Sequence, residues 1–340
     1  MVIKRALKYA GTITLLAALC SSAQAAEVKS IAILTPEQGT DFGWNQQGID
    51  AARAAGKAEN VDVMVAENLG YGDARPTLRD LTDDGAQLLI AHASGYNMAA
   101  PEIGAQTQIP VAITDRPDAR KEGAVADYTS SGHEGAYLAG VLAAKMTRTG
   151  TLGIVVSGEP PSWNAQSSAF IQGARATKAD IKIRYAVIGP AAYSDAAGGK
   201  RVTSSVIAAG ADIVFGQGNG SSFGMLQAVE TSKAIDGGKV YFIDVIGDKS
   251  SIDKGNLLSS VIWNLTPVFT AMIQDLKADK FGSRNYTTSL KDGSVSLLQT
   301  KHIPADIWQQ VNAVSDEISS GKLTVTPHYD ARFLHNLLGG

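Results

Sequence analysis

Apolar residues along the chain form short continuous runs that alternate with longer segments of helical periodicity. The first half contains four such runs, rich in β-branched residues, at residues 30–34, 61–66, 87–91 and 110–114. A second series follows at residues 151–156, 181–187, 212–215 and 239–244. Short runs without polar alternation are typical of strands that are buried on both faces, as in a parallel sheet.

The segments between these runs have the apolar spacing of amphipathic helices. We expect helices near residues 45–57, 75–84, 98–107, 135–146, 166–178, 198–209 and 222–232. Strands that alternate with helices indicate parallel sheets with helices on both faces. The sequence therefore predicts an α/β protein made of doubly wound parallel sheets.

The chain has 340 residues, more than one hydrophobic core usually supports, so two lobes are expected. The strand–helix order occurs once before about residue 130 and once after it. We place lobe 1 at residues 26–130 with part of about 264–300, and lobe 2 at residues 131–263 with part of about 300–340. Periodicity alone does not assign the last segment, roughly residues 257–340, to either lobe.

The N-terminus has the three parts of a secretory signal peptide. Lys4, Arg5 and Lys8 form its positive region, residues 10–19 form a short apolar stretch, and a small-x-small cleavage site ends at Ala25. The only cysteine, Cys20, follows a bulky Leu19, which disfavours lipid attachment. We expect residues 1–25 to be removed and the mature chain, without cysteine, to act in a periplasm.

Charge and histidine spacing exclude several classes of partner. The full chain has a formal net charge of −3, and removal of the basic signal segment makes the mature chain more negative. Nucleic acids and anionic membranes both require clustered Lys and Arg, so neither is expected as a partner. The five histidines show no metal-ligand spacing, and no metal or other cofactor is expected.

Polar and aromatic side chains follow the ends of the predicted strands, where doubly wound sheets bind their ligands. After the first strand come Asp41, Phe42, Trp44 and Asn45, and Tyr96 follows the third strand. Trp44 offers a flat face for stacking on a base or a sugar ring, although a residue that begins a helix often packs into the core. Phe42 is the alternative candidate for the aromatic side chain that lines the ligand cleft.

Asp115 and Arg116 directly follow the fourth strand. A carboxylate beside a forked cationic donor suits the vicinal hydroxyls of a sugar, and the same pair is equally consistent with a surface salt bridge in a turn.

The second half of the chain supplies the candidates for the opposite wall. Trp163 lies in a turn that begins with two prolines, where it caps a ligand or packs the hinge. Asn219 lies between glycines, which let the backbone approach a ligand or form a tight turn. Asp244 ends a predicted strand, and Trp263 follows the last apolar run.

An enzyme is the competing class of protein. Residues 220–224 read GSSFG, which fits the G-x-S-x-G pattern of a serine hydrolase with Ser222 as the nucleophile. Asp248 with His302 or His328 follows in the required chain order, but no HGGG-type oxyanion-hole sequence precedes it. We expect no catalytic residue and no enzymatic activity.

Several motifs resemble those of one family. The D-x-x-aromatic-N-Q pattern at residues 41–46, the EGAYLAG sequence at residues 134–140, FIQG at 170–173 and ADIVF at 211–215 occur in the order found in the BMP (basic membrane protein, PnrA-like) family. Members of this family are solute-binding proteins of ABC transporters. The resemblance covers residues 31 to about 323.

The resemblance implies a type I periplasmic-binding-protein fold, in which two lobes joined by a multi-strand hinge close on a ligand. It also implies a monomer that serves an ABC permease in the inner membrane and binds a nucleoside or related purine compound. Asp41, Trp44, Asn45 and Asp115 match family ligand positions, and either Asp244 or Asp248 matches a further family acid, whereas Trp263 replaces a family lysine. A ring in place of that lysine leaves a monosaccharide as the alternative ligand.

Overall fold

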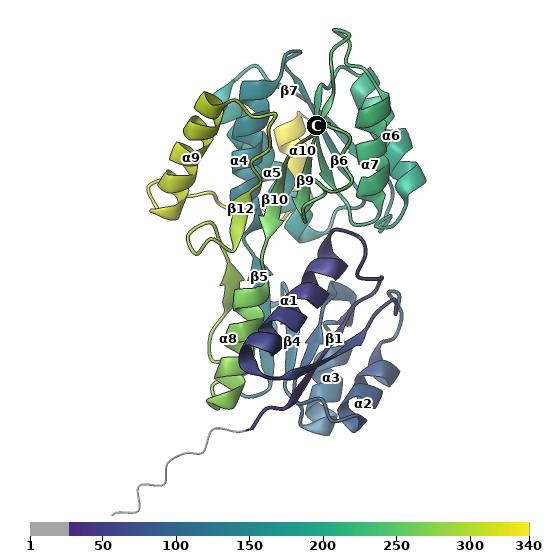
Figure 1. Cartoon of the computed structure of the whole chain (residues 1–340), viewed down its shortest axis with the longest axis vertical. Helices are drawn as coiled ribbons and strands as arrows, with labels where there is room; N and C mark the ends of the chain where they lie inside the picture. The colour runs from purple at the N-terminus through teal and green to yellow at the C-terminus, as the bar shows by residue number, and fades with distance from the viewer. Residues whose placement is uncertain (1–26, 340) are drawn as a thin grey trace, which may run out of the picture.

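The computed structural model describes residues 27–339, so the expected signal peptide, with Cys20 and the cleavage site, lies outside the described residues. These residues form two lobes, each built on one six-stranded sheet (Figure 1). The sheet of lobe 1 has the order β11-β5-β4-β3-β1-β2, and all its neighbouring strands are parallel. Its strands are β1 (Ser30–Leu34), β2 (Asp62–Ala66), β3 (Leu89–Ala91), β4 (Val111–Thr114), β5 (Val125–Ser130) and β11 (Tyr286–Thr288).

Helices cover both faces of this sheet because successive side chains of a strand point to opposite faces. Ile31 and Ile33 of β1 pack with α1 (Trp44–Glu59) and α8 (Thr266–Lys277) on one face. Ala32 and Leu34 pack with α2 (Arg75–Asp83) and α3 (Ala99–Thr107) on the other. The continuous apolar runs read in the sequence are therefore strands buried on both sides.

Lobe 2 repeats the plan with the order β12-β10-β9-β8-β6-β7, in which only β12 pairs antiparallel. Its strands are β6 (Thr151–Val156), β7 (Lys182–Val187), β8 (Ile213–Gln217), β9 (Tyr241–Ile246), β10 (Leu257–Trp263) and β12 (Val295–Leu297). The helices are α4 (Gly132–Met146), α5 (Pro161–Thr177), α6 (Ala196–Ala208), α7 (Ser221–Thr231), α9 (Ala305–Ser319) and α10 (Ala331–Leu338).

The chain passes between the two sheets three times (Figure 1). It crosses from β5 to α4, returns from β10 to α8, and crosses again from β11 to β12. A multi-strand hinge of this kind holds the lobes together while leaving their facing edges free to approach. Within residues 27–339, no helix has both the length and the apolar character needed to span a bilayer.

The predicted fold class is confirmed, and each predicted strand and helix is present, most of them with shifted ends. One start is wrong by five residues: α5 begins at Pro161, so Trp163 lies in the first helical turn and not in a loop. Proline at the first helical position fits because its missing N–H has no partner there. The strands β5, β10, β11 and β12 were not predicted, since three of them lie in segments with weak periodicity.

Candidate functional site

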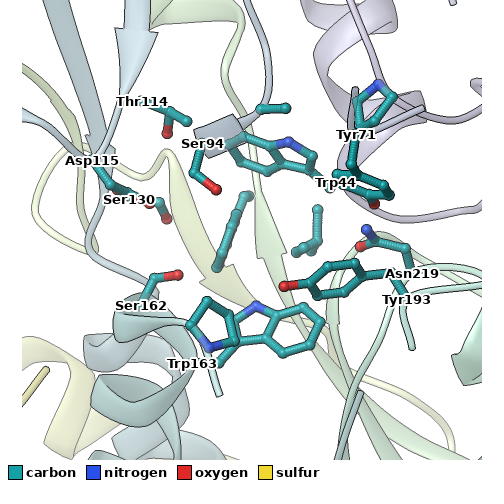
Figure 2. Close-up of a pocket in the computed structure, with 15 residues that line it drawn as sticks. Trp44, Tyr71, Ser94, Thr114, Asp115, Ser130, Ser162, Trp163, Tyr193 and Asn219 are labelled. Atoms are coloured by element: carbon teal, nitrogen blue, oxygen red, sulfur yellow. The ribbon is translucent and has the colours of Figure 1, made fainter. Parts of the chain in front are cut away.

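A cavity of about 110 Å³ lies between the two lobes, at the carboxyl ends of their parallel strands (Figure 2). Lobe 1 contributes lining from the loops after β1 to β5: Pro36, Trp44, Tyr71, Ala93, Ser94, Thr114, Asp115 and Ser130. Lobe 2 and the hinge strand β10 contribute Pro160, Ser162, Trp163, Tyr193, Asn219, Ile246 and Trp263. Five of the residues predicted from the sequence, Trp44, Asp115, Trp163, Asn219 and Trp263, are thus brought together.

Trp44 begins α1 and is held in a fixed orientation. Its Nε1–H donates to the carbonyl of His92 at 2.9 Å, and the His92 ring stacks on the indole with centroids 3.8 Å apart. Trp263 contacts it edge-on, with ring centroids 6.0 Å apart. Because Trp44 is only partly buried and also lines the cavity, it has both a packed side and a side that faces the cavity.

The rings of His92 and Tyr128 stack on the packed side of Trp44. Both side chains are fully or almost fully buried, and desolvation lowers the pKa of His92 to about 3, which keeps the ring neutral. His92 Nε2 lies 2.8 Å from the carbonyl of Trp44, so this nitrogen carries the proton. Nδ1 then accepts from the Tyr128 hydroxyl at 2.7 Å. This chain of hydrogen bonds fixes the first turn of α1 against the sheet.

Asp41 and Asn45 lie outside the cavity lining, where they order the loop that carries Trp44. The Asp41 carboxylate accepts hydrogen bonds from the backbone N–H groups of Gly43, Asn45 and Gln46, at 3.0–3.1 Å. The Asn45 side chain also donates to Asp41, at 2.8 Å. These bonds satisfy backbone donors at the start of α1 that have no helical partner. Both side chains are buried, so their groups are engaged within the protein.

Asp115 and Arg116 are adjacent in sequence but point to different surroundings. Asp115 lines the cavity, at a left-handed backbone position (φ 55°) directly after β4. Arg116 forms a bidentate pair with Asp118 at 2.9 and 3.0 Å and is absent from the lining. Of the two roles that the sequence left open for Asp115 and Arg116, the joint binding of sugar hydroxyls is not assembled. Arg116 makes a surface salt bridge, because the turn at Pro117 directs the guanidinium to its own loop.

The walls of the cleft alter the ionisation of Asp115. Asp115 is solvent-exposed, but protein surrounds its carboxyl on several sides. Desolvation, together with the nearby Asp127, raises the pKa of Asp115 to about 7. The side chain therefore changes charge near neutral pH and is able to donate or accept a hydrogen bond.

We expect Asp115 to make stability fall as the pH rises. The folded chain holds this proton up to about pH 7, whereas the unfolded chain releases it near 3.8, so the contribution is present at low pH and lost through pH 7. Asp115→Asn removes the ionisation, and its melting temperature relative to wild type should increase from pH 5 to pH 8. Asp118→Asn is the control, since Arg116 lowers the pKa of Asp118 below this interval. A pH-independent difference for Asp115→Asn would contradict the assignment.

The lobe 2 wall presents buried polar atoms without a protein partner. Trp263 Nε1 and Asn219 Oδ1 have no hydrogen bond, although their side chains are only 4% and 5% exposed. Ser130 Oγ, from the facing lobe, is also unpartnered. Buried polar groups in native proteins nearly always have a partner, so these three atoms are unsatisfied positions within the cavity wall, with Trp263 Nε1 against Gly132 and Asn219 Oδ1 against Gly43.

Phe42, Tyr96 and Asp244 are placed beside the cavity and do not line it. The Tyr96 hydroxyl donates to the carbonyl of Gly70 at 2.6 Å, in the core of lobe 1. Phe42 contacts Phe223 of lobe 2 edge-on, with centroids 6.1 Å apart. Asp244 is fully buried and pairs with the equally buried Lys249. Desolvation raises the pKa of Asp244, and the charge of Lys249 opposes that shift.

Direct contacts join the two lobes around the cavity. Lys249 Nζ, in lobe 2, donates to the carbonyl of Phe42 at 3.1 Å. Ser194 donates to Glu37, which also accepts from Tyr71 at 3.2 Å. The rings of Tyr71 and Tyr193 lie 5.6 Å apart, one from each lobe. The structure is therefore a closed arrangement of the lobes.

Sequence reasoning did not select Tyr71, Tyr193 or Lys249. Tyr71 and Tyr193 follow β2 and β7, so the rule that ligands bind at strand ends contained the signal for them. Lys249 gave no such signal, because its pairing with Asp244 depends on how the loop after β9 folds back.

Ser222 does not have the surroundings of a nucleophile. It lies in the first turn of α7, is fully buried, and its hydroxyl donates to the carbonyl of Asn219 at 2.6 Å. The downstream histidines are engaged elsewhere: His302 contacts Tyr241, and His328 stacks on Phe333. The motif match at residues 220–224 is thus the turn between β8 and α7.

Two parallel-sheet lobes, a three-segment hinge and a cavity between facing strand ends define a solute-binding protein of the two-lobed type. Residues 28–327 match the model of the Bmp family, the PnrA-like substrate-binding proteins of ABC transporters, and the chain belongs to this family.

Among similar proteins, the ABC transporter nucleoside-binding protein BmpA of Lactococcus lactis is 30% identical over 59% of this chain and 60% of its own. A purine-binding protein of Brucella abortus is 23% identical over 83% of this chain and 79% of its own. A solved ABC-transporter solute-binding protein from Aeropyrum pernix superposes with a TM-score of 0.77 at 17% identity, covering 91% of this chain and 96% of that one. This last likeness supports the fold.

Proposed function

We propose that the protein is the periplasmic receptor of an ABC importer and binds a nucleoside or related purine compound between its lobes. One observation carries this proposal: Trp44 of lobe 1 and Trp163 of lobe 2 line a single cavity from opposite sides (Figure 2). A flat ring system between two indoles gains stacking energy from both lobes at once. The names of the relatives that bind nucleosides and purines agree with this ligand class.

Binding is coupled to closure, because a solute that contacts both walls stabilises only the closed form. The closed form then docks, as a monomer, on a permease of the inner membrane and undergoes no chemistry. The lobes that move are residues 26–130 with part of 264–300, and residues 131–263 with part of 300–340. Strand β11 pairs in the sheet of lobe 1 and supports this division, whereas β12 (Val295–Leu297) pairs in the sheet of lobe 2 before residue 300.

A monosaccharide is the second candidate ligand. Asp115 in the lining supplies a carboxyl for sugar hydroxyls, and an indole such as Trp263 packs well against a sugar face. The missing contact is Arg116, which is paired with Asp118. A sugar would therefore be held by one carboxyl, whereas a purine uses both tryptophans, and we prefer the purine.

Thermal unfolding with a panel of solutes tests the proposal. Purified protein is heated with purine bases, nucleosides and pyranoses, each at increasing concentration. A solute at about 100 times its dissociation constant adds roughly 2.7 kcal/mol to the free energy of unfolding. We expect a rise in melting temperature with purine compounds. Stabilisation by pyranoses alone, or by no member of the panel, would refute the purine function.

Trp44→Ala is expected to weaken purine binding by about tenfold, because base stacking on an aromatic ring contributes roughly 1–3 kcal/mol. Calorimetry gives the affinity and circular dichroism the fold. Trp44→Phe keeps a ring and should lose less. Trp308→Ala, in α9 away from the cavity, is the matched control and should bind as wild type does. Equal binding by Trp44→Ala and wild type would remove Trp44 from the site.

A further inference from the structure

The cavity is small and closed at its rim by residues of both lobes. Its volume, about 110 Å³, is well below the roughly 300–1,000 Å³ of typical sites for drug-sized ligands. Tyr71 and Tyr193 approach each other across the cleft, with ring centroids 5.6 Å apart, and both line the cavity (Figure 2). Beside them, Glu37 accepts hydrogen bonds from Tyr71 and from Ser194 of the other lobe. A substituent that projects from a bound ring toward this rim meets the tyrosine pair.

The lining has little capacity for a phosphate. Among the described residues, it contains one carboxyl, Asp115, and no cationic side chain. The nearby cations are already paired: Lys249 with Asp244, and Arg116 with Asp118. A buried phosphate without a cationic partner carries a large desolvation cost, so nucleotides are excluded.

We propose that the receptor selects the free purine base over its nucleoside and nucleotide, and that the Tyr71–Tyr193 pair is the residue pair that sets this selectivity. The inference rests on the proposed purine function. The base lies between Trp44 and Trp163, and the tyrosine rim occupies the space that a ribose needs.

Isothermal titration calorimetry with adenine, guanine, hypoxanthine, their nucleosides and AMP tests this selectivity. We expect each base to bind at least 100-fold more tightly than its nucleoside, and AMP not to bind. Tyr71→Ala should raise nucleoside affinity about tenfold and change base affinity less than threefold. Tyr71 is 49% exposed, so its removal leaves the core intact. Tyr71→Phe keeps the ring and loses only the bond to Glu37, so it should retain wild-type selectivity.

A wild-type protein that binds nucleosides as tightly as bases, or a Tyr71→Ala variant with unchanged selectivity, would overturn this inference and leave the purine function intact. Binding of pyranoses without any purine would overturn both.

Discussion

Replacing Lys249 by alanine is expected to lower the free energy of unfolding by about 3–5 kcal/mol, because the change leaves a buried carboxylate without its counter-charge. Lys249 and Asp244 have no exposed side-chain surface, and within residues 27–339 the ammonium is the only side-chain partner of the Asp244 carboxylate. Asp244 Oδ1 already lacks a hydrogen bond, so the loss is not compensated by a second donor. Urea denaturation of the wild type and the variant measures the difference.

The double variant Lys249→Met with Asp244→Leu separates burial from pairing. Removing both charges should recover most of the stability, since well-packed apolar residues replace a buried ion pair at little cost. Lys254→Ala is the matched control, because this lysine of the pair with Glu230 is mostly solvent-exposed, and the change should cost less than about 1 kcal/mol. If Lys249→Ala costs no more than Lys254→Ala, the buried pair has no such role.

The pair also links stability to closure. Lys249 Nζ donates to the carbonyl of Phe42 in the other lobe, so the ammonium that neutralises Asp244 also bonds across the cleft. The double variant should therefore fold stably and still bind solute more weakly than the wild type. The double variant thus separates the effect of this pair on stability from its effect on affinity.

The fold was predictable because its cause is local. In β1, four consecutive apolar residues follow Ser30, and all four are fully buried between two helix layers. Where such runs alternate with amphipathic helices along the chain, the favourable structure for each run is a strand buried on both faces. In contrast, β11 and β12 have three residues each and exposed positions within them, so their pairing depends on the other lobe elements and leaves little trace in the sequence.

The sequence predicted residues of the site only where their position at the end of a strand determines that they line the cavity. Trp44, Asp115 and Asn219 line the cavity because strand ends of a parallel sheet converge there. Arg116 shows the limit: one residue further along the chain, a proline turn sends the side chain to Asp118. Asp41 shows another limit, since a carboxylate next to a helix start serves the backbone equally well as a ligand. Residue type determines which interactions a side chain can make, but the local backbone direction determines which partner it meets.

Substituting Gly247 with alanine is expected to weaken solute binding by about 100-fold while leaving the unliganded protein folded. In the closed structure, a Cβ at Gly247 would clash with the carbonyl oxygen of Phe42 in the other lobe. Both sides of this contact are backbone, so no side-chain rotation relieves it, and only separation of the lobes does. Overpacking of this kind costs about 1–3 kcal/mol, and the closed state alone bears the cost.

Calorimetry with the best-binding solute gives the affinity of Gly247→Ala, and small-angle scattering gives the separation of its lobes. Gly72→Ala is the control, because no atom lies within 4 Å of the Cβ it would add. The Gly247 variant should stay extended at solute concentrations that make the control compact. Its melting temperature without solute should match that of wild type, since opening removes the clash. Wild-type affinity in Gly247→Ala would show that tight binding does not require the approach of Gly247 to Phe42, and closure would then have to be assigned to other contacts.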